Sequence, residues 1–366
     1  MFRFSIIIVC RNAEKIIKRT IESVFSQIYP FVEVIVIDGA SVDKTLDILN
    51  KYSDDKRLLV FSEKDSGIYN AMNRGITKAS GDYIYFLNAG DVFYDKDVLY
   101  KASEYIITAD KPDILIGNYI EKRHEISKIV HMEEGWDLRE ILPKGRGVCH
   151  QAVFAKAACL QGGFNEEYRI VADYDWLCRK FLSGCRIEWI DLIISEYDIY
   201  GVSSLAKNWV ETKEERRRIV KAYFPDMEEK IDDELAFQYG QAKNQKMQEY
   251  LSDILALKQR HISLRQFFKE HSLYEISIYG FQYLGQRLLE ELEVSDIKVT
   301  CVIDRDHSFQ NMKVPLKHAE DELDAVDAIV VTPIFEFYSI KQELQDRTQA
   351  EIISIEDIIN SMYSDI

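Results

Sequence analysis

The segment EKDSGIYNAMNRGITKASGDYIYFLNAGD, residues 63–91, decides the fold. After a polar loop, apolar residues recur at helical spacing over 68–79, and Tyr83 to Leu87 then form an apolar run typical of a buried strand. This run opens into Asn-Ala-Gly-Asp at 88–91. Ligands of open α/β sheets bind at the carboxyl ends of strands. A carboxylate there is a hard oxygen ligand, so the segment predicts that Asp91 helps Mg²⁺ or Mn²⁺ hold a phosphate-bearing substrate.

The same alternation continues on both sides of this segment. Strands are expected at 4–10, 32–37, 58–61 and 83–87, and helices at 13–27, 43–52 and 68–79. Such alternation predicts an α/β fold with a mostly parallel sheet covered by helices on both faces. Beyond residue 113 the pattern becomes irregular, with short strands near 114–119 and 126–131, a helix at 172–182 and a strand at 186–190. An irregular half of this kind usually completes a site.

The rest of the chain predicts a linker and a second unit. Two long helical patterns, at 205–223 and 227–258, are separated by Pro225. A new alternation follows, with strands at 276–279, 298–303, 328–331 and 351–354 and helices at 282–292 and 335–344. We therefore expect a first domain over 1–204, a helical linker region over 205–272 and a smaller Rossmann-like α/β domain over 273–366.

Composition excludes several classes of protein. The chain has 366 residues, 47% of them hydrophobic, which suits two globular domains. A formal net charge of -16 argues against nucleic acid as a partner. The six cysteines form no CxxC pair, so reduced thiols in a cytoplasmic protein are expected. No apolar run approaches the ~20 residues of a membrane helix, and no signal peptide is evident, which predicts a soluble or at most peripheral protein.

Carboxylates follow three of the predicted strands. Asp38 comes after the second strand, Asp65 after the third and Asp91 after the fourth, while Asp43 lies in the loop after Asp38. Parallel strands place these positions at one edge of the sheet. For Asp43 a helix N-cap is the better interpretation. For the other three carboxylates, their recurrence at the same edge of the sheet indicates a role beyond that of turn residues.

Four motifs resemble a known family. SIIIVCRN at 5–12, VIDGASVDKT at 36–45, the 63–91 segment and ADYDWLCR at 172–179 are together similar to the inverting family 2 glycosyltransferases of GT-A fold, a nucleotide-diphospho-sugar transferase fold with a Rossmann-like mixed sheet. The match is closest to bacterial enzymes that build surface polysaccharides, and it covers the first expected domain. The resemblance implies a nucleotide-diphospho-sugar donor, a divalent cation, and transfer to an acceptor hydroxyl with inversion at the anomeric carbon.

The resemblance also implies roles for residues of the donor side. The residues expected to line the donor nucleotide pocket are Asn12, Asp38, Asp65 and Asn73. Asp91 is expected to hold Mn²⁺ or Mg²⁺. The family's metal motif usually carries two or three acids around a DxD pattern, whereas Asp91 is the only acid in 88–91. Weaker metal affinity is the expected consequence.

On the acceptor side, Asp173 corresponds to the family's catalytic base. The family has a Glu-Asp pair here, but Ala172 replaces its first member. Removal of the acceptor proton by Asp173 would raise the rate by ~10²- to 10⁴-fold, and a helix N-cap is the alternative role. Asp175 is expected to serve structure or to contact the acceptor.

Three further motifs match the family. GVCHQAVF contains His150 and Gln151, a His-Gln pair that either contacts substrate or forms hydrogen bonds in the core. The Gly-Gly-Phe turn at 162–164 precedes the base helix, and its glycines supply backbone freedom. Ser203 in YGVSS belongs to a loop expected to close over the donor.

Two features of the second half leave alternatives open. Arg216, Arg217, Arg218 and Lys221 could face anionic lipid head groups, although a solvated helix face balanced by glutamates is favoured. In IYGFQYLGQRLL, residues 278–289, Gln282 replaces the middle glycine of the dinucleotide-binding frame, and Asp304 follows at a ribose-binding position. Docking or dimerisation is favoured over nucleotide binding.

The sequence thus predicts a cytoplasmic glycosyltransferase, in peripheral contact with the inner membrane face, that uses a UDP-sugar and a saccharide or lipid-linked acceptor in bacterial polysaccharide synthesis. A homodimer is compatible with this prediction. A second function stays open because the metal motif keeps a single acid and Ala172 replaces another acid. This function is that of a catalytically weakened sugar-nucleotide-binding or scaffolding protein. The third possibility is that the C-terminal domain is a nicotinamide-dependent enzyme domain.

Overall fold

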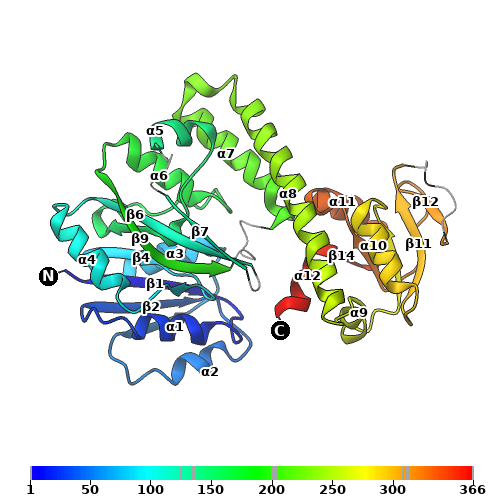
Figure 1. Cartoon of the computed structure of the whole chain (residues 1–366), viewed down its shortest axis with the longest axis horizontal. Coiled ribbons are helices and arrows are strands. Elements are labelled where there is room, and N and C mark those ends of the chain that lie inside the picture. Colours follow the sequence, from blue (N-terminus) through cyan, green and yellow to red (C-terminus); the bar gives the residue numbers. More distant parts are fainter. Residues whose placement is uncertain are drawn as a thin grey trace. The chain divides into compact units, whose positions relative to one another are not determined.

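The computed structural model describes residues 2–123, 126–132, 137–198, 205–306, 309 and 313–364. The chain divides into two compact units (Figure 1). The first contains Met1–Gly201 and Glu214–Leu235, and the second contains Val202–Lys213 and Ala236–Ile366. The predicted linker region therefore does not stand apart, because its residues are shared between the two units.

The first unit is built on a nine-stranded sheet with the order β3-β2-β1-β4-β8-β6-β9-β5, and β7 pairs with β6. Its strands are β1 (Phe4–Cys10), β2 (Val32–Asp38), β3 (Leu58–Ser62), β4 (Tyr83–Phe86), β5 (Val92–Phe93), β6 (Ile114–Arg123), β7 (Ile126–Val130), β8 (Val153–Lys156) and β9 (Ile187–Asp198). Its helices are α1 (Ile17–Phe25), α2 (Thr45–Asn50), α3 (Ile68–Lys78), α4 (Val98–Thr108), α5 (Leu138–Ile141) and α6 (Ala172–Leu182). Two longer helices, α7 (Trp209–Tyr223) and α8 (Ile231–Gln259), contribute residues to both units.

The position of the ligand crevice follows from the strand order. β1 pairs in parallel with both β2 and β4, so the chain changes sides of β1 between β3 and β4. Such a switch point opens a crevice at the carboxyl ends of the two central strands. Here these ends lead into residues 11–12 and 87–91. β8 runs antiparallel to β4 and β6, which makes the sheet mixed and confirms the predicted fold class.

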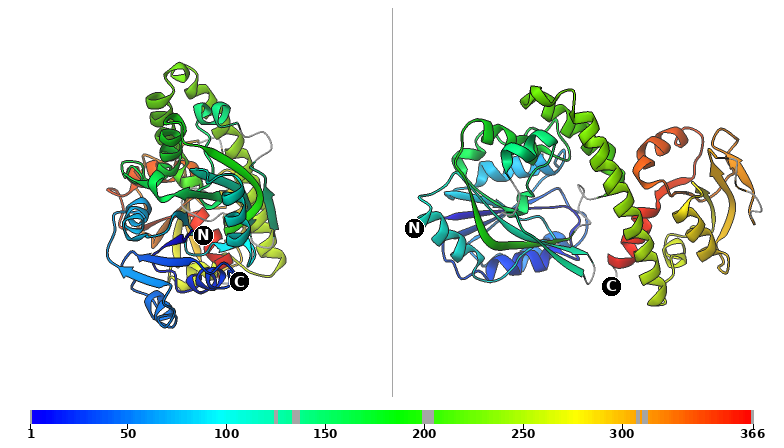
Figure 2. Two further views of the ribbon diagram at one scale, coloured as in Figure 1. Left: turned by 90° about the vertical axis from the view of Figure 1, so that its left-hand side faces the viewer. Right: turned by 45° about the horizontal axis from the view of Figure 1, so that its top comes forward.

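Helices cover both faces of this sheet (Figure 2). α1 and α4 pack on one face through residues such as Ile21 and Leu99. α3 and α6 pack on the other face, where Met72 and Trp176 are buried. The strands β1, β2 and β4 are buried along their whole length, which explains their nearly continuous apolar sequence.

Several elements differ from the sequence prediction. β9 has 12 residues and extends to Asp198, well beyond the predicted end at 190, because it pairs with β6 along most of its length. β5, α4 and β8 were not predicted. α1 begins at Ile17, since residues 13–16 form a turn in which the Ala13 backbone N–H donates to Thr45 Oγ1 at 2.7 Å.

The second unit is a smaller parallel sheet with the order β12-β11-β10-β13-β14, which is Rossmann-like as predicted. Its strands are β10 (Glu275–Tyr279), β11 (Lys298–Asp304), β12 (Leu316–His318), β13 (Ala328–Val331) and β14 (Glu351–Ser354), and its helices besides α8 are α9 (Arg265–Glu270), α10 (Tyr283–Leu292), α11 (Phe337–Leu344) and α12 (Ile355–Ser364). α9, β12 and α12 were not predicted. Within the described residues, no helix is both long and apolar enough to cross a membrane.

The first βα turn of this unit is closely packed by its own chain. Gly280 has a φ of +88°, and a Cβ there would lie 2.6 Å from Pro333. The Thr332 hydroxyl donates to the Gly280 carbonyl at 2.7 Å, and the Phe281 backbone N–H donates to Asp304 Oδ2 at 2.7 Å. Pro333 and Asp304 thus contact the turn that a pyrophosphate would approach. This packing favours the structural interpretation over nucleotide binding.

Candidate active site

The 88–91 loop is positioned by β1 and α1. The backbone N–H of Ala89 donates to the Val9 carbonyl at 3.1 Å, so the loop continues alongside β1. Gly90 has a φ of +100°, which favours glycine, and its N–H donates to Thr20 Oγ1 at 2.9 Å. Its carbonyl accepts from Arg19 Nε at 2.7 Å. These bonds place Asp91 at the edge of the crevice.

Asp91 is bound to the Gln151 side chain. The Gln151 amide nitrogen donates to Asp91 Oδ2 at 3.0 Å, and the Cys149 thiol donates to Gln151 Oε1 at 2.7 Å. The main-chain carbonyl of Gln151 accepts from the hydroxyls of Tyr85 and Ser195, at 2.5 and 2.7 Å. Asp91 and Gln151 are 6% and 7% exposed. The predicted metal residue and the second residue of the His-Gln pair therefore form one buried unit.

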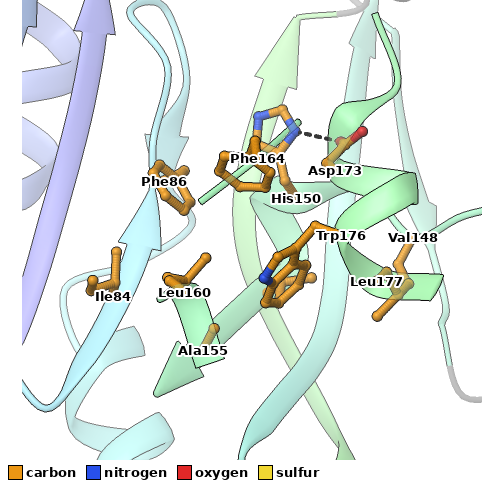
Figure 3. Close-up of a pocket in the computed structure, with 11 residues that line it drawn as sticks. Ile84, Phe86, Val148, His150, Ala155, Leu160, Phe164, Asp173, Trp176 and Leu177 are labelled. Carbon is orange, nitrogen blue, oxygen red and sulfur yellow. Dashed lines mark hydrogen bonds and ion pairs between the residues drawn. The ribbon is translucent and has the colours of Figure 1, made fainter. Parts of the chain in front are cut away.

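A second chain of hydrogen bonds joins the loop to the predicted base. His150 lies on a short 3₁₀ turn, with Nδ1 2.9 Å from Asp173 Oδ2 (Figure 3) and Nε2 3.0 Å from Asn88 Nδ2. The Tyr69 hydroxyl lies 3.0 Å from Asp173 Oδ1 and also donates to the Ile170 carbonyl at 2.7 Å. Burial and the negative charge of Asp173 raise the pKa of Tyr69 well above its ordinary value. Tyr69 therefore stays protonated, and its single hydroxyl hydrogen lies within reach of both the Ile170 carbonyl and Asp173.

α7 fixes the entry into the base helix α6. Glu215 is buried, and its carboxylate accepts from three consecutive backbone N–H groups, those of Arg169, Ile170 and Val171, at 2.6, 3.0 and 3.1 Å. These residues immediately precede α6, whose second residue is Asp173. A carboxylate from α7 thus anchors the turn that precedes Asp173, the predicted base.

Asp175 is a structural residue on the same helix. It is 1% exposed, and its carboxylate accepts from Arg179 Nε at 2.9 Å and from the Tyr223 hydroxyl at 3.0 Å. Burial and the charge of Asp175 raise the pKa of Tyr223 to about 12. Of the two roles predicted for Asp175, its contacts therefore support the structural one.

An apolar cavity lies behind the His150–Asp173 pair (Figure 3). Its lining residues are Ile84, Phe86, Val148, His150, Val153, Ala155, Leu160, Phe164, Asp173, Trp176 and Leu177. His150 and Asp173 are the polar side chains among them. Apolar walls exclude water from one side of the pair, which strengthens the hydrogen bond between its members.

Asp38 and Asn12 join the loops that follow β1 and β2. Asp38 is fully buried, and its carboxylate accepts from Ser62 Oγ at 2.6 Å, from the Ser41 backbone at 3.0 Å and from the Cys10 thiol at 3.7 Å. Asn12 accepts from the Val42 backbone at 3.0 Å, while its own N–H donates to Ser41 Oγ at 2.7 Å. In this structure both side chains brace the loops on the donor side of the crevice.

The other two residues predicted for the donor pocket differ in placement. Asp65 is half-buried beside Gly39, whose missing side chain leaves room for the Asp65 carboxylate. Asn73 instead clamps the turn before α6, because its Oδ1 accepts from the Phe164 N–H at 2.8 Å and its Nδ2 donates to the Phe164 carbonyl at 3.0 Å. Asp65 therefore lies beside the residue that follows β2, and Asn73 lies against the Gly-Gly-Phe turn.

The structure brings together Asp91, His150, Gln151 and Asp173, and leaves Asn73 and Asp175 in supporting contacts. Ser203 lies outside the described residues. The sequence assigned no site role to Asn88 or Tyr69. It placed Glu215 on a solvated helix face, which is wrong, because Glu215 is 2% exposed and its carboxylate accepts from backbone N–H groups. Asn88 stands in the frame of the metal motif, and Tyr69 follows the loop of Asp65, so both positions carried a local signal. Glu215 carried none, because its partners are 44 to 46 residues away.

Three of the four basic residues in the predicted cluster on α7 contact partners within the first unit, and the Nε of the fourth, Arg216, is buried without a hydrogen-bond partner in the part of the chain that the structure describes. Arg217 Nε lies 2.6 Å from Asp232, Lys221 lies 3.8 Å from Glu228, and the Arg218 guanidinium lies over the Tyr168 ring. These contacts support a balanced helix face more than an open anionic-lipid surface.

The described residues contain no group of three or more His, Cys, Asp or Glu side chains arranged to hold a metal ion. Asp91 is the only carboxylate of the 88–91 loop, and one of its oxygens already accepts from Gln151. This donor set suits Mg²⁺ or Mn²⁺ shared with phosphate oxygens of a substrate, and does not suit an all-protein cage.

Comparisons with known proteins identify the family of this chain. The glycosyl transferase family 2 model matches residues 5–163. A PGL/p-HBAD biosynthesis glycosyltransferase of Mycobacterium tuberculosis is 31% identical over 203 residues, which cover 54% of this chain and 77% of the relative. The putative teichuronic acid biosynthesis glycosyltransferase TuaG of Bacillus subtilis is 36% identical over 105 residues, covering 28% of this chain and 41% of that protein.

The crystal structure of S. aureus TarS 1-349 in complex with UDP-GlcNAc aligns with a TM-score of 0.52 and 21% identity, over 66% of this chain and 72% of that one. At this identity the likeness concerns the fold alone. Together with the family match, it confirms the family and the GT-A fold that the motifs predicted. The chain belongs to the family 2 glycosyltransferases.

Proposed function

We propose that the first unit transfers a sugar, with inversion, from a UDP-sugar to a hydroxyl of a carbohydrate or lipid-linked carbohydrate in the synthesis of a bacterial surface polysaccharide. The observation that carries this proposal is the Asp173 carboxylate, held by His150 and Tyr69 within one network that includes the 88–91 loop. The names of the relatives, PGL/p-HBAD and teichuronic acid biosynthesis, and the UDP-GlcNAc of TarS support the substrate classes.

In the proposed step, Asp173 accepts the proton of the acceptor hydroxyl while the hydroxyl oxygen attacks the anomeric carbon. The bond from that carbon to the diphosphate breaks, its electron pair stays on the phosphate oxygen, and the nucleoside diphosphate leaves. Attack from the face opposite the leaving group inverts the anomeric configuration. General-base assistance of this kind is worth ~10²- to 10⁴-fold. His150 and Tyr69 orient the carboxylate so that it meets the hydroxyl in one geometry.

On the donor side, Asp91 would hold Mn²⁺ or Mg²⁺, which neutralises charge on the leaving diphosphate. We place donor contacts at Asn12 and Asp65, at the edge of the crevice. Asp38 would act with them by bracing residues 39–41, since its carboxylate bonds to Ser41 and Ser62. A cytoplasmic location at the inner membrane face and a homodimer stay predictions.

The alternative, a sugar-nucleotide-binding protein without catalysis, is less well supported because both His150 and Tyr69 contact the Asp173 carboxylate. A panel of UDP- and GDP-sugars with Mn²⁺ and saccharide acceptors distinguishes the two. We expect release of nucleoside diphosphate that depends on acceptor, and a product whose anomeric configuration, read from its NMR coupling constant, is opposite to that of the donor. Donor binding without turnover across the panel would favour the alternative, and retained configuration would exclude inversion.

A further inference from the structure

Asn88 occupies the frame where the family usually has an acid, and its contacts point to a purpose for the amide. Its Nδ2 lies 3.0 Å from His150 Nε2, whereas its Oδ1 is buried and has no hydrogen-bond partner. Buried polar atoms are nearly always paired, and each exception needs an explanation. The amide nitrogen therefore contacts His150, and the buried amide oxygen has no hydrogen-bond partner among the described residues.

The hydrogen-bond partners of His150 determine which ring nitrogen carries the hydrogen. An ionised Asp173 only accepts hydrogen bonds, so His150 Nδ1, 2.9 Å from Asp173 Oδ2, must carry a hydrogen. In a neutral imidazole, Nε2 is then a lone pair that only a donor can face. The Asn88 NH₂ group is such a donor. A carboxylate at position 88 would instead favour a second proton on the ring.

The other titratable groups near the ring do not compete for this role. Burial raises the pKa of both Tyr69 and Cys149 well above their ordinary values, so each stays protonated. Asp91 is bound by Gln151. Asp173 is thus the carboxylate that the imidazole contacts, and an aspartate at position 88 would be the second.

We propose that Asn88 is a positioning residue that fixes neutral His150 as its Nδ1–H tautomer, and that its buried Oδ1 accepts a hydrogen bond from a hydroxyl of the bound donor sugar. The first part concerns the protein alone, and the second rests on the proposed function. A protonated imidazole would withdraw charge from Asp173 and weaken it as a base. The amide at position 88 therefore orients His150 toward Asp173 without adding a charge, and is more than a loss of the metal motif.

The tautomer can be read by NMR of the full chain labelled with ¹⁵N-histidine. The variant His150→Gln identifies the His150 signals by their loss. Near neutral pH we expect wild-type His150 to show a protonated Nδ1 and an unprotonated Nε2, and Asn88→Asp, the isosteric variant, to show both nitrogens protonated. Asn50→Asp adds the same charge at an exposed position of the first unit and should match the wild type. A protonated Nε2 in the wild type, or unchanged signals in Asn88→Asp, would overturn the proposal.

Kinetics test the consequence for catalysis. Asn88→Asp keeps an oxygen toward the donor, so we expect kcat to fall about tenfold at neutral pH while the donor KM changes less. Its pH profile should differ from that of the wild type, because the added carboxylate faces the imidazole. Asn88→Ala removes both the nitrogen and the oxygen of the amide, so we expect kcat to fall and the donor KM to rise. A pH profile of Asn88→Asp that coincides with the wild type would contradict the role. Because the NMR measurement needs no turnover, absence of transfer by the wild type would reject the proposed function and leave the tautomer result to stand alone.

Discussion

The Glu215 carboxylate lies 3.1 Å from the backbone nitrogen of Val171, the residue that directly precedes the base helix. Two more N–H groups, of Arg169 and Ile170, bond to the same side chain. α7 therefore determines how α6 begins, although it lies beyond the four motifs that carry the family resemblance. The placement of Asp173, the proposed base, therefore depends on a residue from the predicted linker region.

Glu215→Gln should disturb this turn. A Gln amide has one acceptor oxygen, and its NH₂ group would face backbone N–H donors, so we expect a loss of about 1–3 kcal/mol in the free energy of unfolding. Transfer activity should fall with it, because Asp173 follows the turn. Urea unfolding and kcat measure the two effects. Glu214→Gln is the matched control, since Glu214 is exposed and pairs with Arg217 at 3.7 Å. Equal behaviour of the two variants would refute the anchoring role.

Gly163→Ala should destabilise the first unit more than Gly162→Ala. Both glycines have positive φ, +64° and +85°, so alanine costs about 1–2 kcal/mol at either position. A Cβ at Gly163 would also collide with Asn73 Oδ1, whereas nothing lies within 4 Å of a Cβ at Gly162. Thermal unfolding of the two variants separates the cost of the positive φ, which both share, from the cost of the clash with Asn73, which only Gly163→Ala has. If Gly162→Ala is as destabilising as Gly163→Ala, the Asn73 clamp adds nothing.

Asp91→Asn should raise the Mn²⁺ concentration needed for half-maximal transfer. The amide keeps an oxygen but loses the charge that a hard cation prefers. We expect the increase to exceed about tenfold, as one lost charge interaction of 1.4 kcal/mol implies. Asp54→Asn, at an exposed position, controls for net charge. Identical Mn²⁺ titrations for Asp91→Asn and the wild type would remove Asp91 from the metal site.

Glu356 should make the stability of the second unit depend on pH. Burial raises the pKa of Glu356 above its ordinary value, 4.5, although the Tyr250 hydroxyl and the backbone N–H groups of Ala206 and Lys207 donate to it. The folded state therefore binds this proton more tightly than the unfolded chain. The resulting stability is complete below 4.5 and is lost as the pH rises through the raised pKa.

Unfolding midpoints measured across this pH window test that effect. The difference between the wild type and Glu356→Gln should shrink or change sign as the pH rises, because the neutral amide does not titrate. Glu351→Gln, an exposed change on β14, should give a difference independent of pH. A constant difference for Glu356→Gln would mean that the carboxyl does not titrate differently in the folded state.

The sequence predicts the parts of this fold that local patterns specify. Apolar runs and helical spacing identified β1 to β4 and α3 closely, and Asp91 follows the end of β4 as the carboxyl-edge rule requires. Contacts between residues far apart in the chain could not be predicted from these local patterns. The extent of β9 depends on β6, some 70 residues earlier, and the Asn88–His150–Asp173 chain joins segments separated by 62 and 23 residues. Motif matching found His150 and Asp173 separately, but only the folded chain shows that they are hydrogen-bonded.

The role of Asn73 illustrates the same limit. The family resemblance directed it to the donor nucleotide, while its amide bonds to Phe164 on both sides. A helix residue with a polar side chain can face a ligand or a neighbouring turn, and its sequence neighbours do not distinguish the two.

The most direct test of the catalytic account compares Asp173→Asn with the wild type in the acceptor-dependent release of nucleoside diphosphate. The isosteric amide keeps the shape of the site but cannot take the acceptor proton, so we expect kcat to fall by ~10²- to 10⁴-fold. Donor affinity, measured by calorimetry with UDP and Mn²⁺, should stay unchanged. Turnover by Asp173→Asn at the wild-type rate would show that Asp173 is not the base.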